Sequence, residues 1–202
     1  EGTIMFFEPY YWLIIPGLLL GLYAQFKLTS TYNRYVRQPL ESGVTGAQAA
    51  RVILDRAGLQ DVDIHPVQGH LTDHYDPRRK VLRWSQGVAE SPSVASLAIA
   101  AHELGHAMQD SEGYFPLRVR SALVPMVNIG SYLGWILIML GLFLRLTDLA
   151  WLGVFAFAGG AVFALATLPV ELNASRRARQ LLTNTGLIVG EDEQRGVNTV
   201  LN

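Results

Sequence analysis

The chain has 202 residues, of which 50% are hydrophobic and 16% charged, with 16 Lys and Arg against 17 Asp and Glu and a net charge of −1. The low charged share excludes a disordered chain, and the lack of a long basic stretch argues against a nucleic-acid-binding protein. The chain has no cysteine, which excludes disulfides, thiolate metal ligands and a cysteine nucleophile. A metal ion would have to be held by His, Asp and Glu.

Three apolar segments, residues 5–26, 121–144 and 149–170, are predicted to be transmembrane helices. The second and third contain no formal charge, and at ~1.5 Å rise per residue they would reach about 36 Å and 33 Å, more than the roughly 30 Å of a hydrocarbon core. The alternative is a buried hairpin of a soluble protein, which needs much shorter helices. In the first segment, Pro16 is expected to kink the helix. We expect a retained anchor there rather than a signal peptide, because no basic residue precedes it and no small-x-small cleavage site follows it.

The basic residues near the ends of these segments predict the orientation of the chain, because Lys and Arg accumulate on the cytoplasmic side. One side of the membrane would have eight basic residues near the ends of the segments, whereas the other side would have only Arg145. We therefore expect residues 27–120 and 171–202 to face the cytoplasm together, so that both can contribute to one site. The eight basic residues are Lys27, Arg34, Arg37, Arg118, Arg120, Arg176, Arg177 and Arg179.

The first polar segment is predicted to contain two helices. Thr45 is typical of an N-cap, apolar residues recur at helical spacing over residues 46–57, and Gly58 fits the position after the helix end. Ser91, followed by a proline, predicts the start of a second helix. This second helix is expected to run to about Asp110.

Two short strands are predicted between these helices. Apolar and polar residues alternate around residues 62–66 and 81–85, and Asp76 followed by a proline predicts a turn between them. The expected fold class is therefore an α-helical membrane protein with a small α+β cytoplasmic domain at residues 27–120. The fold should be mainly helical, with a short β-sheet next to the helix that follows Ser91.

That second helix carries the sequence His102-Glu103-Leu104-Gly105-His106. Two histidines four residues apart lie on one helical face, so both rings can bind one ion about 2.0 to 2.1 Å from each nitrogen. Glu103 can reach a water molecule held by that ion. The pattern is the zincin arrangement and predicts a Zn²⁺ site with His102 and His106 as ligands and Glu103 as the catalytic base. The alternative is a pair of core histidines that neighbouring groups satisfy.

A catalytic zinc ion needs a third protein ligand and one open position. Glu171 is the strongest candidate, because it directly follows the third apolar segment, where a carboxylate is costly without a partner such as a cation. The alternative is an interfacial Glu171 that pairs with Arg176 or Arg177. The other candidate ligands are His65, His70, Asp73 and His74.

Three longer motifs follow one another along the chain. They are Leu71-Thr-Asp-His-Tyr-Asp-Pro77, Ala101-His-Glu-Leu-Gly-His-Ala107 and Leu168-Pro-Val-Glu-Leu-Asn-Ala-Ser-Arg-Arg-Ala178. Together with the opening apolar segment they resemble the YugP-type bacterial membrane zinc metallopeptidases, over nearly the whole chain. The resemblance implies His102, His106 and Glu171 as zinc ligands and Glu103 as base. It also implies a zincin-like domain on the cytoplasmic side of a bacterial inner membrane.

More distantly, the layout is similar to that of gluzincin membrane peptidases of the HtpX kind, where Glu-x-x-Ala-Asp supplies the third ligand. Ser175 stands in place of that Asp, so Ser175, Asn173 or Asp110 is expected to orient a ligand histidine. In those enzymes an edge strand before the zinc helix holds the substrate backbone. The resemblance implies residues 79–85 as its counterpart.

The expected function is a zinc-dependent endopeptidase that hydrolyses membrane proteins or polypeptide segments beside the membrane. Its oxyanion needs a hydrogen-bond donor, for which His74, Tyr75 and Arg176 are candidates. The alternative for His74 is a turn residue with a backbone hydrogen bond. The alternative for Arg176 is a contact with lipid headgroups.

Other classes of protein remain as alternatives. A non-catalytic, zinc-stabilised membrane adaptor is the main one, although it would not need Glu103 and structural zinc sites usually close with four protein ligands. Cleavage within the bilayer is disfavoured because the motif helix has no apolar run of spanning length, and a transporter is disfavoured by the small number of spans. The expected partners are polypeptide substrates and the lipid bilayer, and no nucleic acid.

Overall fold

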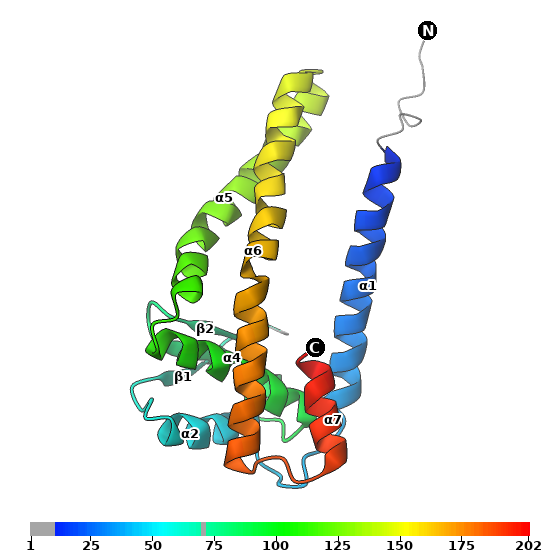
Figure 1. Cartoon of the computed structure of the whole chain (residues 1–202). Coiled ribbons are helices and arrows are strands. Elements are labelled where there is room, and N and C mark those ends of the chain that lie inside the picture. Colours follow the sequence, from blue (N-terminus) through cyan, green and yellow to red (C-terminus); the bar gives the residue numbers. More distant parts are fainter. Residues whose placement is uncertain (1–10, 70–71) are drawn as a thin grey trace.

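The computed structural model describes residues 11–69 and 72–202. Within these ranges the protein is mainly helical, with a three-stranded sheet. A body of shorter helices and the sheet lies at one end, and three long helices extend from it in the same direction (Figure 1). These are α1 (Tyr11–Tyr35), α5 (Phe115–Phe143) and α6 (Thr147–Thr185).

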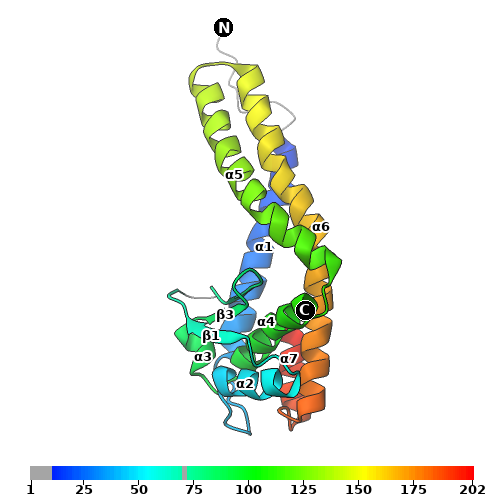
Figure 2. The same cartoon turned by 90° about the vertical axis from the view of Figure 1, so that its left-hand side faces the viewer.

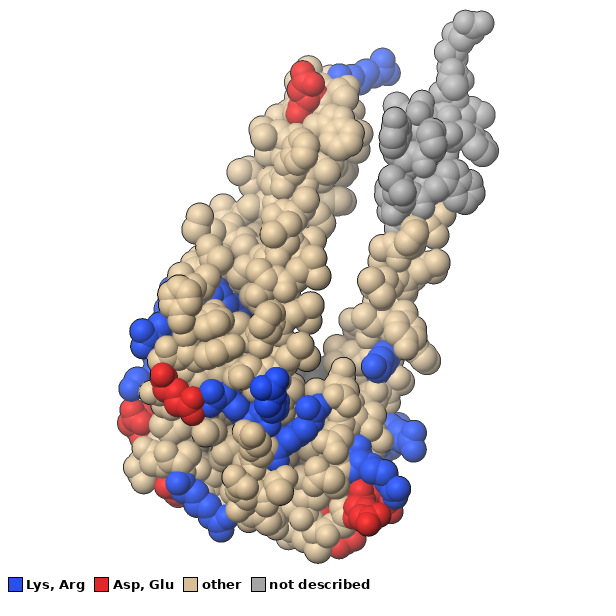
Figure 3. All heavy atoms as spheres, viewed as in Figure 1, with Lys and Arg blue, Asp and Glu red and all other residues tan. Residues whose placement is uncertain are grey.

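Helices α5 and α6 form an antiparallel hairpin that stands away from the body (Figure 2). Their backbones approach closely at glycines: a Cβ atom added to Gly134 would lie 2.8 Å from the backbone oxygen of Gly153. The outward faces expose large apolar side chains, and charged side chains gather on the body and at the tip of the hairpin (Figure 3). Both helices are long and apolar enough to cross a membrane, a criterion of length and composition only.

The long helices extend beyond the apolar segments seen in the sequence. Helix α5 begins at Phe115 rather than Ser121, with a proline in its first turn. Helix α6 continues through Pro169 to Thr185, so the third apolar segment and the residues after it form one helix. Helix α1 likewise passes through Pro16 and continues to Tyr35, whereas residues 5–10 of the first predicted segment lie outside the described residues.

The two helices predicted in the polar segment are present. Helix α2 (Gly46–Arg56) has the expected Thr45 cap, whose side chain accepts from the Gln48 backbone N–H. Helix α4 (Val94–Ser111) contains the His-Glu-x-x-His motif, but its N-cap is Ser93 and not Ser91. The helix starts late because residues 92–93 are extended, paired with residues 39–40 through a bridge and a backbone hydrogen bond.

The sheet contains one more strand than the sequence predicts. Strands β1 (Asp63–Pro66) and β3 (Val81–Trp84) are parallel neighbours, and β2 (His74–Asp76) pairs antiparallel with the other side of β3. The expectation that residues 79–85 form the edge strand is therefore wrong. Strand β3 is central, with both edges hydrogen-bonded, and only an unpaired edge can accept another strand.

Helix α4 lies at the centre of the body. It packs against α2, α6, the short α3 (Gln86–Ala89) and the C-terminal α7 (Glu191–Val200), with β2 and β3 on another side. Small residues on α4 let these elements approach closely. The side chains that fill the surrounding core include Leu54, Leu82, Trp84, Leu97, Leu104 and Leu182. The motif histidines are therefore held on a rigid, central element.

Candidate metal centre

The two motif histidines lie on one face of α4, one turn apart. Their ring centroids are 4.9 Å apart with the rings nearly perpendicular. His106 is buried and His102 is partly exposed. Because both rings project from a capped, buried helix, their separation is set by the backbone rather than by a mobile loop.

Helix α6 brings Glu171 to these histidines. Glu171 Oε2 lies 3.1 Å from His102 Nε2 and 3.4 Å from His106 Nε2. Ligand atoms 2.0 to 2.1 Å from one tetrahedral ion would be about 3.3 Å apart, so these separations fit a zinc ion. Two imidazole nitrogens and a carboxylate oxygen are also a donor set of catalytic zinc sites. In the described residues this is the one group of three such side chains close enough to share a metal ion. We call the side chains of His102, His106 and Glu171 the metal cluster.

The second nitrogen of each ring is held by a neighbouring side chain. His102 Nδ1 is 3.2 Å from Ser175 Oγ, and His106 Nδ1 is 2.9 Å from Gln109 Oε1. Of the three residues expected to orient a ligand, Ser175 contacts a histidine directly. Asn173 instead contacts Gln109, and Asp110 accepts from the Tyr75 hydroxyl.

Two residues at the site were not singled out from the sequence. Gln109 is buried against His106, one turn further along α4. Arg120, at the start of α5, lies 2.8 Å from Glu171 Oε1, the oxygen that faces away from the histidines. The position of Gln109 three residues after His106 was a usable signal. Arg120 shows no such signal, because basic residues beside an apolar segment look alike in a sequence and all indicate topology.

Glu103 is nearly buried, with 9% of its surface exposed. Its Oε2 accepts a hydrogen bond of 2.9 Å from the backbone N–H of Tyr75 in β2. Burial raises the pKa of Glu103 to about 7, although His102 and the Tyr75 N–H act in the opposite direction. A carboxyl group with such a pKa can both take and give a proton near neutral pH.

The candidate oxyanion donors are placed differently from one another. His74 is exposed, and its Nδ1 donates to the Thr72 carbonyl at 2.8 Å, the backbone hydrogen bond considered as its alternative role. The Tyr75 hydroxyl donates to Asp110 Oδ2. Burial raises the pKa of this phenol, and its hydrogen bond to Asp110 raises it further. Arg176 is exposed on α6, and no hydrogen bond or ion pair among the described residues joins it to the metal cluster.

Those alternative third ligands that the structure describes lie outside the group of His102, His106 and Glu171. His65 is exposed in β1, and the Asp73 carboxylate accepts from the backbone N–H and hydroxyl of Ser85. His70 lies outside the described residues. Glu171 is therefore the candidate that the fold brings to the two histidines.

A comparison with known families agrees with this geometry. The family described as "putative neutral zinc metallopeptidase" matches residues 10–202. The chain belongs to this family. The metallopeptidase is also 44% identical over 189 residues to the "putative membrane protease YugP" of Bacillus subtilis (strain 168), a match that covers 94% of this chain and 84% of that protein. No solved structure matches the chain. The family resemblance expected from the three sequence motifs is confirmed.

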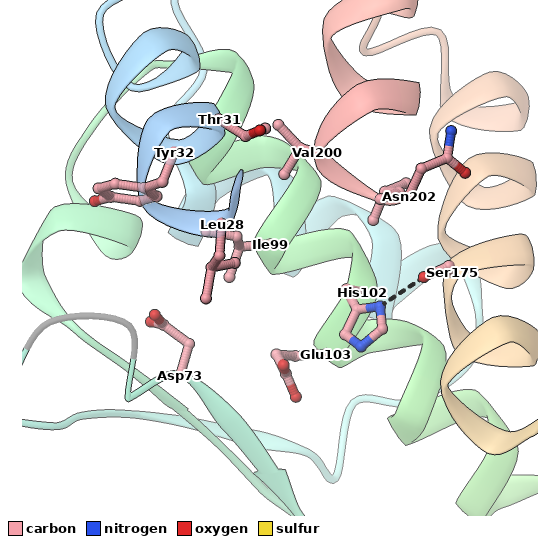
Figure 4. Close-up of a pocket in the computed structure, with 11 residues that line it drawn as sticks. Leu28, Thr31, Tyr32, Asp73, Ile99, His102, Glu103, Ser175, Val200 and Asn202 are labelled. Carbon is pink, nitrogen blue, oxygen red and sulfur yellow. Dashed lines mark hydrogen bonds between the residues drawn. The ribbon is translucent and has the colours of Figure 1, made fainter. Parts of the chain in front are cut away.

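Two cavities of about 360 Å³ flank the group formed by His102, His106 and Glu171. The first is bordered by His102 and Glu103, and Figure 4 shows Leu28 of α1 and Asp73 on its other sides. The second is bordered by His106, Arg120 and the β2 strand. An extended polypeptide that passes the cluster would therefore have room for side chains on both sides.

Proposed function

We propose that the protein is a membrane-embedded, zinc-dependent endopeptidase. In this proposal His102, His106 and Glu171 hold Zn²⁺, and Glu103 is the general base. The observation that carries the proposal is the convergence of the three ligand atoms, all within 4.8 Å of one another, beside a nearly buried glutamate. A structural zinc site would usually close with a fourth protein ligand, which the described residues do not bring to this cluster.

Bound zinc would activate a water molecule and polarise the scissile carbonyl group. Glu103 would accept a proton from the attacking water and return it to the leaving amine. The Tyr75 N–H holds the Glu103 carboxylate in place for this transfer. Arg120 holds Glu171 from the side opposite the histidines, so that one carboxylate oxygen remains directed at them.

Strand β2 is our candidate for holding the backbone of the substrate. It is an edge strand of the sheet and lies beside α4, joined to Glu103 through Tyr75. Main-chain hydrogen bonds to an edge strand bind an extended peptide without regard to its sequence. For the oxyanion, His74 is the remaining candidate near the cluster, because it borders the same cavity as His106. Its Nε2 could donate only from a doubly protonated ring, since Nδ1 already donates to a carbonyl.

We further propose that α1, α5 and α6 cross the inner membrane of a bacterium and that the body faces the cytoplasm. All three helices leave the body in the same direction (Figure 1), which is what three crossings with both polar segments on one side require. The exposed apolar faces of α5 and α6 and the basic side chains on the body support this arrangement. The relative from Bacillus subtilis is itself named a "putative membrane protease". The substrates would be membrane proteins or segments close to the membrane surface.

The proposal is tested by Glu103→Gln in the full chain, purified in detergent. We expect this variant to keep the zinc content of the wild type and to lose hydrolysis of casein and of membrane-derived peptides, because the amide cannot accept the proton. Glu90→Gln, an exposed glutamate at the end of α3, is the matched control and should retain activity. Equal activity of Glu103→Gln and wild type would exclude Glu103 as the base. Zinc binding without hydrolysis in the wild type would instead favour the membrane adaptor.

A further inference from the structure

A network of hydrogen-bonded polar side chains connects the protein surface to His106. Arg177 on α6 forms a two-pronged ion pair with Glu112 at the end of α4, with N–O distances of 2.6 and 2.7 Å. Its Nε donates to Asn173 Oδ1 at 2.8 Å. Gln109 connects Asn173 to His106. This network therefore links four side chains on two helices to one candidate zinc ligand.

The donor and the acceptor of each hydrogen bond in this network can be assigned, starting from Arg177, because a guanidinium group can only donate. The Asn173 atom that faces Arg177 Nε must therefore be the amide oxygen. An oxygen of that kind can only accept, so the Gln109 atom 2.9 Å from it must be the amide nitrogen.

A backbone group gives the same orientation of Gln109 independently. Gln109 Nε2 is also 2.9 Å from the carbonyl oxygen of Val170, which can only accept and cannot be flipped. Gln109 is fully buried, so water does not compete for its amide. With both N–H groups donating to α6, the Gln109 oxygen must face His106, at 2.9 Å from Nδ1.

We infer that Gln109 is a positioning residue that fixes the protonation of His106. Because the Gln109 oxygen can only accept, His106 Nδ1 must carry the proton, and in the neutral ring this leaves the lone pair on Nε2. Nε2 is the atom that lies 3.4 Å from Glu171 Oε2 and faces the metal position. A neutral His106 ring with its proton on Nδ1 is the form that binds a metal ion through Nε2. This inference rests on the proposed function, since it concerns His106 as a zinc ligand.

The same amide also joins the two helices that supply the ligands. Val170, whose carbonyl it binds, directly precedes Glu171. A purely structural role for Gln109 would consist of this link alone. The two roles differ in which half of the amide matters: the oxygen sets the protonation of His106, and the nitrogen ties α4 to α6.

The first experiment reads the protonation directly in the metal-free full chain. In protein labelled with ¹⁵N-histidine, at a pH of about 8, above the usual histidine pKa of ~6.5, long-range ¹H–¹⁵N spectra show which ring nitrogen carries the proton. We expect His106 to be protonated on Nδ1. A His106 ring that carries its proton on Nε2 and none on Nδ1 would overturn the inference, and this result does not depend on whether the protein cuts peptides.

The second experiment compares zinc affinities by competition with a chelator. Gln109→Met keeps the length of the side chain but removes the acceptor. We therefore expect zinc to bind about 10–100-fold more weakly, the usual cost of losing such a partner. We also expect the proton of the neutral His106 ring to move to Nε2. Gln109→Glu keeps an acceptor for Nδ1 and should keep the Nδ1 proton and lose less affinity. Gln86→Met, an exposed glutamine on α3, is the control and should bind zinc as the wild type does.

The outcomes separate the inference from the proposed function. Equal zinc affinity of wild type and Gln109→Met would overturn the inference. Equal losses of zinc affinity in Gln109→Met and Gln109→Glu, with the same ring nitrogen of His106 protonated in both, would also overturn it. If Gln109→Met does not fold, the wild-type spectrum decides alone. Failure of the wild type to bind zinc would remove the proposed metal site but not the assigned proton on His106.

Discussion

A Cβ atom added to Gly105 would lie 2.5 Å from the carbonyl oxygen of Ala174, so α4 and α6 cross with backbone against backbone at the metal cluster. The crossing point lies between the two motif histidines on α4. On α6 it lies between Glu171 and Ser175, which contact those histidines. A glycine at this one position therefore determines whether the two halves of the site can meet.

Gly105→Ala should separate the two helices and weaken zinc binding. The added methyl group would meet backbone atoms of Ala174, which cannot move aside as a flexible side chain could. Overpacking of this kind typically costs about 1–3 kcal/mol of stability. We expect a lower unfolding temperature and a lower zinc content, measured on the same detergent-purified sample.

Gly159→Ala is the matched control, because a Cβ at this α6 glycine would meet nothing within 4 Å. It should bind zinc as the wild type does. Wild-type zinc binding by Gly105→Ala would show that α4 and α6 can shift without loss of the site.

Arg120→Ala should reduce zinc affinity by about 10-fold, at the low end of the cost of losing a group that holds a ligand. Without the guanidinium group, Glu171 loses the partner of its Oε1 and can rotate away from the histidines. Arg120→Lys retains the charge and should lose less. Arg118→Ala removes an exposed arginine two residues away and should have no effect on zinc affinity. If Arg118→Ala and Arg120→Ala weakened zinc binding equally, Arg120 would act only through general charge.

Tyr75→Phe should leave the turnover number close to that of the wild type. The phenol donates to Asp110 rather than toward the metal cluster, whereas the backbone N–H that holds Glu103 survives the substitution. The lost hydrogen bond should lower stability by about 1–3 kcal/mol. Loss of an oxyanion donor would instead lower kcat by about 10²- to 10³-fold. Steady-state hydrolysis of a fluorogenic peptide distinguishes the two cases.

The parts of the site that could be predicted from the sequence are those on one helix. The spacing of His102 and His106 is a property of any α-helix, and the flanking pattern identifies that helix without knowledge of the fold. Glu171 could be proposed because a carboxylate at the end of an apolar segment needs a partner. Its contact with the histidines depends on the crossing of α4 and α6 at Gly105, which is a tertiary contact.

The parts that could not be predicted depend on tertiary contacts. Strand β2 has three residues, of which only Tyr75 is buried, so it is too short for its period to be recognised in the sequence. Strand β3 is central because β2 pairs with its second edge, and a sheet of β1 and β3 alone would leave β3 at the edge. Arg120 is an ordinary basic residue in the sequence, and its contact with Glu171 appears only when α5 lies against α6. Gln109 contacts His106 within α4, but its hydrogen bonds to α6 depend on the crossing of the two helices.

Glu171→Ala should lower the zinc stoichiometry of the purified protein and remove the stabilisation that zinc provides. A ligand that binds only the folded state stabilises it by about 2.7 kcal/mol at a free concentration 100 times its Kd. We therefore expect a chelator to lower the unfolding temperature of the wild type and to change that of Glu171→Ala much less. Glu191→Ala, an exposed carboxylate at the start of α7, should respond to the chelator as the wild type does. An unchanged zinc content in Glu171→Ala would mean that another residue is the third ligand, and His74, which borders the same cavity as His106, would be the next to test.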